Sequence, residues 1–238
     1  MRSYSPITAR KLPYRAQQNT TRLILSAILL VLMAMPAVAQ DEEDDTDLQL
    51  WNDLEITIPV NKKLDIDTET TLRLEDNISR VDSVRFGFGI TYKPTESFSL
   101  SPYNTFISSR SSSGDYRFEY RAGLDAVFKF PVKGFGLSHR SRIEHRWRPG
   151  NNSWRYRPSI TIEKELPESF LKDAKVFLTE EPFYDSSSGR FSRNRISAGV
   201  EKQVNKKFAV EFYYLFQGDN SSSPGSVHVL GTGWKVSL

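Results

Sequence analysis

The sequence predicts an all-β fold, an up-and-down antiparallel transmembrane β-barrel of about 10–12 strands. Three observations support this prediction. Apolar residues recur with period two from Leu48 to Leu238, without a convincing helical period. The segments with this period are longer than ordinary globular strands. Short connections alternate with more polar ones along the chain, as in outer-membrane barrels.

Residues 1–39 predict a secretory signal peptide. Met1–Arg22 holds five basic residues and no acidic one, the apolar run Leu23–Met33 follows, and Ala37–Ala39 supplies a small-x-small cleavage site. The apolar run is too short to cross a membrane as a helix. We therefore expect cleavage near Ala39, and a mature chain in the outer membrane of a Gram-negative cell.

The charge balance argues against a nucleic-acid partner. The chain has 32 basic and 29 acidic residues, and without the five basic residues of the signal the balance is 27 to 29. Six of the acids lie in residues 40–47, an expected acidic tail, which leaves 27 basic and 23 acidic residues in the expected barrel, residues 48–238. Nucleic-acid-binding domains are far more basic. With three histidines and no cysteine, we expect no metal and no cofactor.

Eleven segments in chain order have the pattern of strands. Single-chain bacterial barrels have even strand numbers, so either Leu48–Val60 is incomplete or another segment is split or missed. Pro182 makes Ala174–Asp185 the weakest of the later strands. The segments are Leu48–Val60, Lys63–Glu75, Ser83–Lys93, Ser97–Arg110, Asp115–Phe130, Gly134–Arg148, Ser153–Glu165, Ala174–Asp185, Arg190–Gln203, Lys206–Gly218 and Ser226–Leu238.

Each predicted strand has one apolar and one polar face. Ser83–Lys93, for example, alternates Val84, Phe86, Phe88, Ile90 and Tyr92 with Arg85, Gly87, Gly89, Thr91 and Lys93. A soluble barrel would bury the apolar face, whereas a membrane barrel exposes it to lipid. Arginine and glutamate recur on the polar face, which favours a membrane barrel with a charged lumen.

Residues 141–160 are rich in arginine and aromatic residues, like a nucleic-acid-binding arm. Period two instead divides them into a lipid face (His145, Trp147, Trp154, Tyr156) and a lumen face (Arg142, Glu144, Arg146, Arg155, Arg157). If Pro149–Asn152 is a four-residue loop, Trp147 opposes Trp154, His145 opposes Tyr156, Glu144 opposes Arg157 and Arg146 opposes Arg155. Opposed like charges are unfavourable, so an acid or an anion must lie between Arg146 and Arg155.

Several short motifs in residues 48–238 share their order and spacing with one family. They are Leu50-Trp51, Arg73, Leu137–Arg142 with Glu144 and Arg146, Trp154–Arg157, Glu181–Asp185, Asn194-Arg195 with Gly199-Val200, Tyr213–Leu215 with Gln217, and His228–Gly231. In these motifs the sequence resembles the bacterial outer-membrane family known as domain of unknown function 2490. The resemblance implies a barrel in the outer membrane, and it brings no established activity and no catalytic residues.

We expect a small porin-like channel for hydrophilic or anionic solutes, with a lumen lined by arginine and glutamate. The arginines either pair with glutamates of other strands (Glu119, Glu163, Glu69, Glu75) or form an anion-selective constriction. The alternative function is a non-conducting structural or envelope-interaction barrel. The candidate lumen and anion-contact residues are Arg117, Arg121, Arg140, Arg142, Glu144, Arg146, Arg155, Arg157, Arg193 and Arg195.

An enzyme is not expected. His139 and Ser141 lie on one face at i and i+2, as in a lipid hydrolase, but the expected neighbours Ile160, Ile162, Ala126 and Leu124 provide no acid to orient the histidine. The expected partners are outer-membrane lipid, lipopolysaccharide phosphates near the arginine-rich loop end, and small solutes. The sequence leaves the oligomeric state open.

Overall fold

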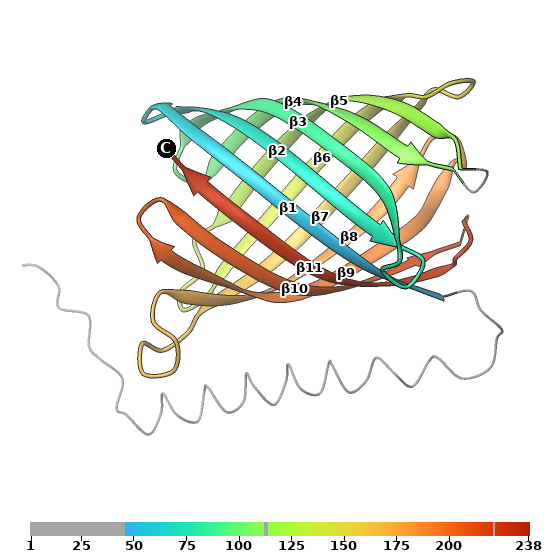
Figure 1. Ribbon diagram of the computed structural model, residues 1–238. Helices are drawn as coiled ribbons and strands as arrows, with labels where there is room; N and C mark the ends of the chain where they lie inside the picture. The colour runs from blue at the N-terminus through green and yellow to red at the C-terminus, as the bar shows by residue number, and fades with distance from the viewer. Residues whose placement is uncertain (1–45, 112–113, 221) are drawn as a thin grey trace, which may run out of the picture. The chain divides into compact units, whose positions relative to one another are not determined.

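The computed structural model describes residues 46–111, 114–220 and 222–238, which form eleven β-strands (Figure 1). None of the described residues forms a helix long and apolar enough to cross a membrane. The strands are β1 (Thr46–Asn61), β2 (Leu64–Glu75), β3 (Arg80–Thr95), β4 (Phe98–Arg110), β5 (Tyr116–Phe130), β6 (Gly136–Trp147), β7 (Ser153–Glu165), β8 (Ala174–Asp185), β9 (Arg190–Asn205), β10 (Phe208–Asp219) and β11 (Ser226–Ser237).

The strands form one closed barrel in which sequence neighbours pair in antiparallel fashion (Figure 1). The barrel closes through a parallel pair, β1 with β11, from Thr46 opposite Ser226 to Thr57 opposite Ser237. All eleven predicted segments are strands, so the expected meander of 10–12 strands is confirmed. The sequence left the parity of the strand number open, and the described residues form an odd number of strands, with β1 complete and no segment split. In a meander with an odd number of strands the first and last strands run in the same direction, and closure must then be parallel.

Pro182 does not interrupt β8. It lies opposite Asn194 of β9, but the pairing of β8 with β7 has a gap between Tyr156 and Ile160, where Pro158 of β7 lies. Proline has no N–H to donate to a ladder, so two prolines at the same level leave a local gap in this strand pair. The strand itself is retained because every residue of its other edge has a partner in β9, with one register shift between Phe183 and Tyr184.

The apolar faces of the strands point out of the barrel. Phe86 of β3, Leu124 of β5 and Phe212 of β10 are 48%, 45% and 58% exposed. Their polar neighbours point inward, where Arg121, Asp125 and Gln217 are buried. This arrangement confirms the predicted faces, and it excludes the soluble alternative, in which the apolar face would be inside.

Among the described residues the interior is mostly polar, with a small apolar cluster and, apart from it, the buried ring of Phe183. Trp51, Leu215, Val227 and Val229 pack together where β1, β10 and β11 meet. They belong to the half of the barrel near the polar loops, since Thr46 of β1 pairs with Ser226 of β11 there. The remaining interior holds most of the buried charged residues of the described chain.

The predicted signal peptide, residues 1–39, and most of the predicted acidic tail, residues 40–47, lie outside the described residues. The barrel begins two residues earlier than predicted. Asp47 lies in β1, is buried, and accepts a hydrogen bond from the backbone N–H of Asn77 at 2.9 Å. The last acid of the tail therefore belongs to the barrel.

Candidate functional site: the charged lumen

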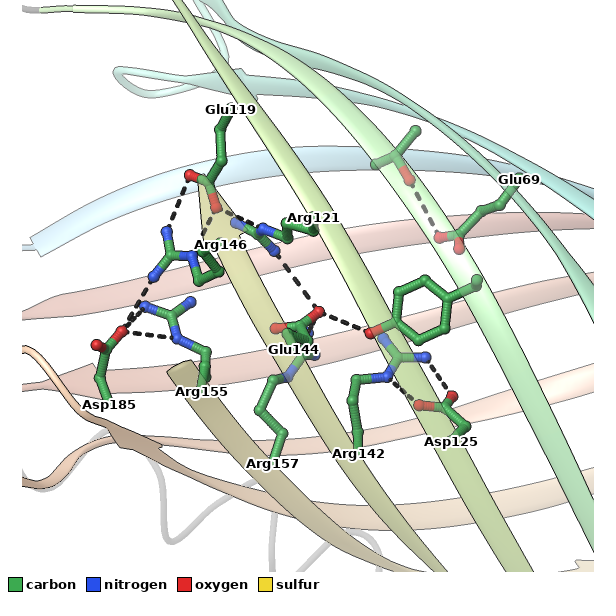
Figure 2. Close-up of polar contacts among 12 residues, drawn as sticks. Glu69, Glu119, Arg121, Asp125, Arg142, Glu144, Arg146, Arg155, Arg157 and Asp185 are labelled. Atoms are coloured by element: carbon green, nitrogen blue, oxygen red, sulfur yellow. Dashed lines mark hydrogen bonds and ion pairs between the residues drawn. The ribbon is translucent and has the colours of Figure 1, made fainter. Parts of the chain in front are cut away.

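Two carboxylates neutralise Arg146 and Arg155 near the loop end of the barrel (Figure 2). Arg146 donates to both oxygens of Glu119, from Nε at 2.6 Å and Nη2 at 2.9 Å, and from Nη1 to Asp185 at 3.0 Å. Arg155 donates to the same Asp185 oxygen from Nε at 3.0 Å and Nη2 at 2.7 Å. Asp185 therefore lies between the two arginines and supplies the acid that the sequence required.

Glu144 is the centre of the network and is 2% exposed. Its Oε1 accepts hydrogen bonds from the Tyr103 hydroxyl at 2.9 Å and from Arg157 Nη1 at 3.3 Å (Figure 2). Arg121 Nη1 lies 3.9 Å from the same oxygen and also pairs with Glu119 at 2.6 Å. The Tyr103 ring crosses Gly123 of β5, where an added Cβ would lie 2.3 Å from the ring. Glycine at this position lets the hydroxyl reach Glu144.

Glu181 shares Arg157 with Glu144 and neutralises two more arginines. It pairs with Arg157 at 2.8 Å, with Arg140 at 2.5 Å and with Arg195 at 4.0 Å. The next inward residue of β8, Phe183, is 2% exposed, and guanidinium groups surround its ring, which gains cation–π attraction. Their ring-centroid distances are 4.4 Å for Arg157, 4.7 Å for Arg195, 5.6 Å for Arg155 and 5.7 Å for Arg193.

Three predicted lumen residues remain to be placed, of which two pair with other acids and one lies outside the network. Arg142 makes a two-pronged pair with Asp125, at 2.7 Å from Nε and 2.6 Å from Nη2. Arg193 pairs with Asp219 through Nε at 2.7 Å. Arg117 is exposed near the start of β5 and has no ion pair with any described residue, so it does not belong to the network. The other nine predicted residues come together in one charged interior.

The predicted register of the β6–β7 hairpin is wrong by two residues. Arg146 lies opposite Ser153, Glu144 opposite Arg155, and His145 opposite Trp154. The connection is longer than four residues because it closes through Asn151 N–H to Arg148 O at 3.1 Å, with Gly150 at a φ of +76°. A shift of two residues leaves every side chain on its predicted face. The cross-strand partners of β6 and β7 therefore differ from the predicted ones, whereas the predicted outer and lumen faces are correct.

The predicted acid partners were only partly correct. Of the four glutamates, Glu119 binds Arg146 and Arg121. Glu163 pairs with Lys175 at 3.0 Å, Glu75 pairs with Arg80 at 2.6 Å, and Glu69 accepts a bond from Thr71 at 3.4 Å. The missed acids are Asp125, Asp219, Glu181 and Asp185. The last two share the period-two face of Phe183, and this is the signal that could have found them.

A cavity of about 330 Å³ lies beside the network. We call the ion-paired lumen face of β5–β9 the paired wall, and the lumen face of β2–β4 the open wall. Small or hydroxylated side chains dominate the open wall, among them Thr71, Gly87, Gly89, Thr91, Ser101 and Thr105. Eight arginines and five carboxylates line the cavity, so its lining has three more positive than negative charges.

His139 and Ser141 are hydrogen-bonded on the outer face. His139 Nε2 lies 2.9 Å from Ser141 Oγ, which lies 3.3 Å from the Tyr156 hydroxyl. Of the four predicted neighbours, Ile160 and Ala126 are present and Ile162 and Leu124 are not. Phe128 and Ile160 flank His139, and Ala126 and Pro158 flank Ser141. The β5–β6 connection, 131–135, is two residues longer than predicted, with Gly134 at a φ of +89°. No described Asp or Glu is bonded to His139, and no group of described His, Asp and Glu residues is arranged to hold a metal.

The geometry defines a closed β-barrel with an apolar exterior and a charged interior that contains a cavity. The chain belongs to the family described as "Protein of unknown function (DUF2490)", whose model matches residues 48–228. No curated protein matches the chain. Among solved structures it is similar to the translocator domain of autotransporter NalP from Neisseria meningitidis, with 13% identity, 71% coverage of each chain and a TM-score of 0.39.

Proposed function

We propose that the protein is an outer-membrane β-barrel that provides a porin-like path for small hydrophilic solutes, with a preference for anions. One observation carries the proposal: the apolar side chains are outside and the ion pairs are inside. Only a lipid surrounding makes such an exterior favourable. The strands have 12–16 residues, enough for a tilted membrane strand of about 9–11 residues. The signal peptide expected at residues 1–39 agrees with export.

The preference for anions follows from the cavity lining. Its three excess positive charges lie in a confined space between low-dielectric walls, where the field acts strongly on a passing ion. The lining arginines come from both walls, so an anion in the cavity meets cations on two sides. Rings of arginine or lysine give anion selectivity in other pores.

A second candidate function is a non-conducting barrel with a structural or envelope-interaction role. The observation that favours it is the density of the paired wall. Arg146, Glu144, Arg157 and Glu181 are all buried and bonded to one another or to further charged groups, so they fill the lumen on their side. Under this proposal the cavity beside them is closed.

Planar-bilayer recording separates the two functions. The purified, folded protein should give discrete current steps, and in a salt gradient the reversal potential should have the sign of an anion-selective pore. A protein that is folded, as shown by heat-modifiable gel migration, and gives no steps in lipid bilayers would overturn the channel and support the structural role.

We further propose that the protein has no enzymatic activity and that its surroundings are outer-membrane lipid, including lipopolysaccharide. No acid in the described part of the chain is bonded to His139 beside Ser141, and a hydrolase of this type needs an acid to orient its histidine. Purified protein should release no fatty acid from phospholipid or lipid A. Fatty-acid release that is lost in Ser141→Ala would contradict this expectation.

A further inference from the structure

Two arginines of the open wall have no carboxylate partner. Arg73 of β2 and Arg85 of β3 both line the cavity. Neither forms an ion pair with any described residue, and the Nε of each is buried without a hydrogen-bond acceptor. By contrast, each lumen arginine of the paired wall has at least one carboxylate within 4.0 Å.

The strand register explains why Arg85 is unpaired. Its cross-strand neighbours are Thr71 of β2 and Ile107 of β4, and Ser83 and Gly87 flank it on the same face of β3. None of these residues is acidic. The residues directly opposite and beside the Arg85 guanidinium are therefore hydroxyl, apolar or glycine. Glu69 of β2 lies at a diagonal position, opposite Gly87, and forms no ion pair with Arg85.

Arg73 packs on an aromatic ring, and Asp53 of β1 is the carboxylate that acts on it most strongly, without an ion pair within 4.0 Å. Its guanidinium carbon lies 3.4 Å from the centroid of the Trp51 ring. Arg73 is opposite Ser83, and Arg85 is opposite Thr71, so the two arginines are diagonal neighbours across the β2–β3 pair. Diagonal side chains on one face of a sheet lie about 7–8 Å apart or less, which lets both guanidinium groups contact one small ligand.

The surrounding charges increase the need for an anion. Among the charged groups that act most strongly on Arg85 are three further cations, Arg73, Arg121 and Arg157, and one carboxylate, Asp82. A buried charge without a partner is unfavourable, and a bound anion that accepts hydrogen bonds from the guanidinium groups removes this cost.

We propose that Arg73 and Arg85 form a binding site for a small phosphate-bearing solute in the barrel cavity. Two planar guanidinium forks match the several acceptor oxygens of a phosphate dianion. The hydroxyl groups of Thr71, Thr91, Ser101 and Thr105 face the same cavity and suit the hydroxyl groups of a polyol portion. The inference rests on the proposed function only in that the solute reaches the cavity through the lumen.

Equilibrium titration in detergent tests the site separately from conduction. Glycerol phosphate, inorganic phosphate and succinate are titrated calorimetrically into the folded, signal-free protein in a phosphate-free buffer. Glycerol phosphate should bind, and Arg85→Gln and Arg73→Gln should each weaken it about tenfold or more. Arg85→Lys should weaken it less, because it keeps the charge and loses the fork. Arg80→Gln is the matched control. Arg80 lies on β3, the strand of Arg85, but it pairs with Glu75 at 2.6 Å and does not line the cavity.

Each outcome decides one point. Absence of glycerol phosphate binding to the wild-type protein, or equal binding by the wild type and both folded glutamine variants, overturns the site even if the barrel conducts. Equal affinity for succinate overturns the assignment to phosphate. Binding that depends on Arg85 in a barrel that gives no current supports the site and overturns the channel.

Discussion

The paired wall and the open wall of the barrel use arginine in opposite ways. On the paired wall, acids are interleaved with arginines, so that Glu144 and Asp185 each contact two cations (Figure 2). Glu181 contacts three. On the open wall, Arg73 and Arg85 lie among threonine, serine and glycine. The same residue type therefore completes a protein-internal network on one side and lacks an internal partner on the other. The difference indicates that the arginines of the paired wall stabilise the barrel, whereas those of the open wall contact a ligand.

The largest effect is expected at the centre of the paired wall. Glu144→Gln keeps the side-chain size and removes the charge between Arg157 and Arg121. Breaking a buried pair leaves an uncompensated cation, so we expect the free energy of unfolding to fall by about 3–5 kcal/mol. Urea unfolding in detergent, followed by tryptophan fluorescence, measures this change.

Glu163→Gln is the matched control for this substitution. Glu163 is 44% exposed, and Lys175, at 3.0 Å, is its only ion-pair partner among the residues that the structure describes. Partly exposed pairs of this kind contribute roughly 0–1 kcal/mol. Losses of equal size in the two variants would show that the paired wall gives no special stability.

A smaller effect is expected at Asp185, where part of the network survives. In Asp185→Asn, Arg146 keeps both bonds to Glu119, whereas Arg155 loses its only ion pair among the described residues. Hydrogen bonds to charged groups contribute about 1.5–3 kcal/mol, so we expect the free energy of unfolding to fall by about 2 kcal/mol. Because Arg155 lines the cavity, the reversal potential should also shift toward stronger anion selectivity.

A double-mutant cycle tests whether this loss belongs to the Arg155 pair. The losses in Asp185→Asn and Arg155→Gln should not add, because each substitution removes the same contact. Ser187→Ala serves as a control, because it removes only the loop bond from Ser187 Oγ to Asp185 Oδ1 at 2.7 Å. Additive losses in the cycle would contradict a direct contribution of this ion pair.

The sequence predicts the faces of this barrel better than its contacts. Period two places Phe86 outside and Arg85 inside whatever the register, since a slip of two residues does not change the face. The partner of Arg146 depends on loop geometry, and Gly150 and Gly134 each allowed a connection longer than predicted. Asp185 could not be assigned to Arg155 because that contact depends on the register between β7 and β8.

The sequence also could not predict that Arg73 and Arg85 lack an ion-pair partner. Period two places both in the lumen with Glu69 and Glu75, and nothing in the pattern distinguishes them from the paired arginines. Only the pairing of β2 with β3 shows that Arg85 faces Thr71, and that the Glu75 carboxylate bonds to Arg80. The parallel closure between β1 and β11 could not be predicted either. The expectation of an even strand number comes from bacterial barrels in general and not from this sequence.

The smallest effect on stability is expected at the open wall, and it gives the sharpest contrast. Arg85→Gln removes a cation that has no carboxylate partner, so in phosphate-free buffer the free energy of unfolding should stay within about 0.5 kcal/mol of wild type or rise. Arg157→Gln, which leaves Glu144 and Glu181 without one of their cations, should lower it by about 3 kcal/mol. With glycerol phosphate present, the wild type should gain stability by ligand linkage and Arg85→Gln should not. A large loss in Arg85→Gln without any ligand would mean that the protein itself neutralises Arg85, and the two walls would then not differ in kind.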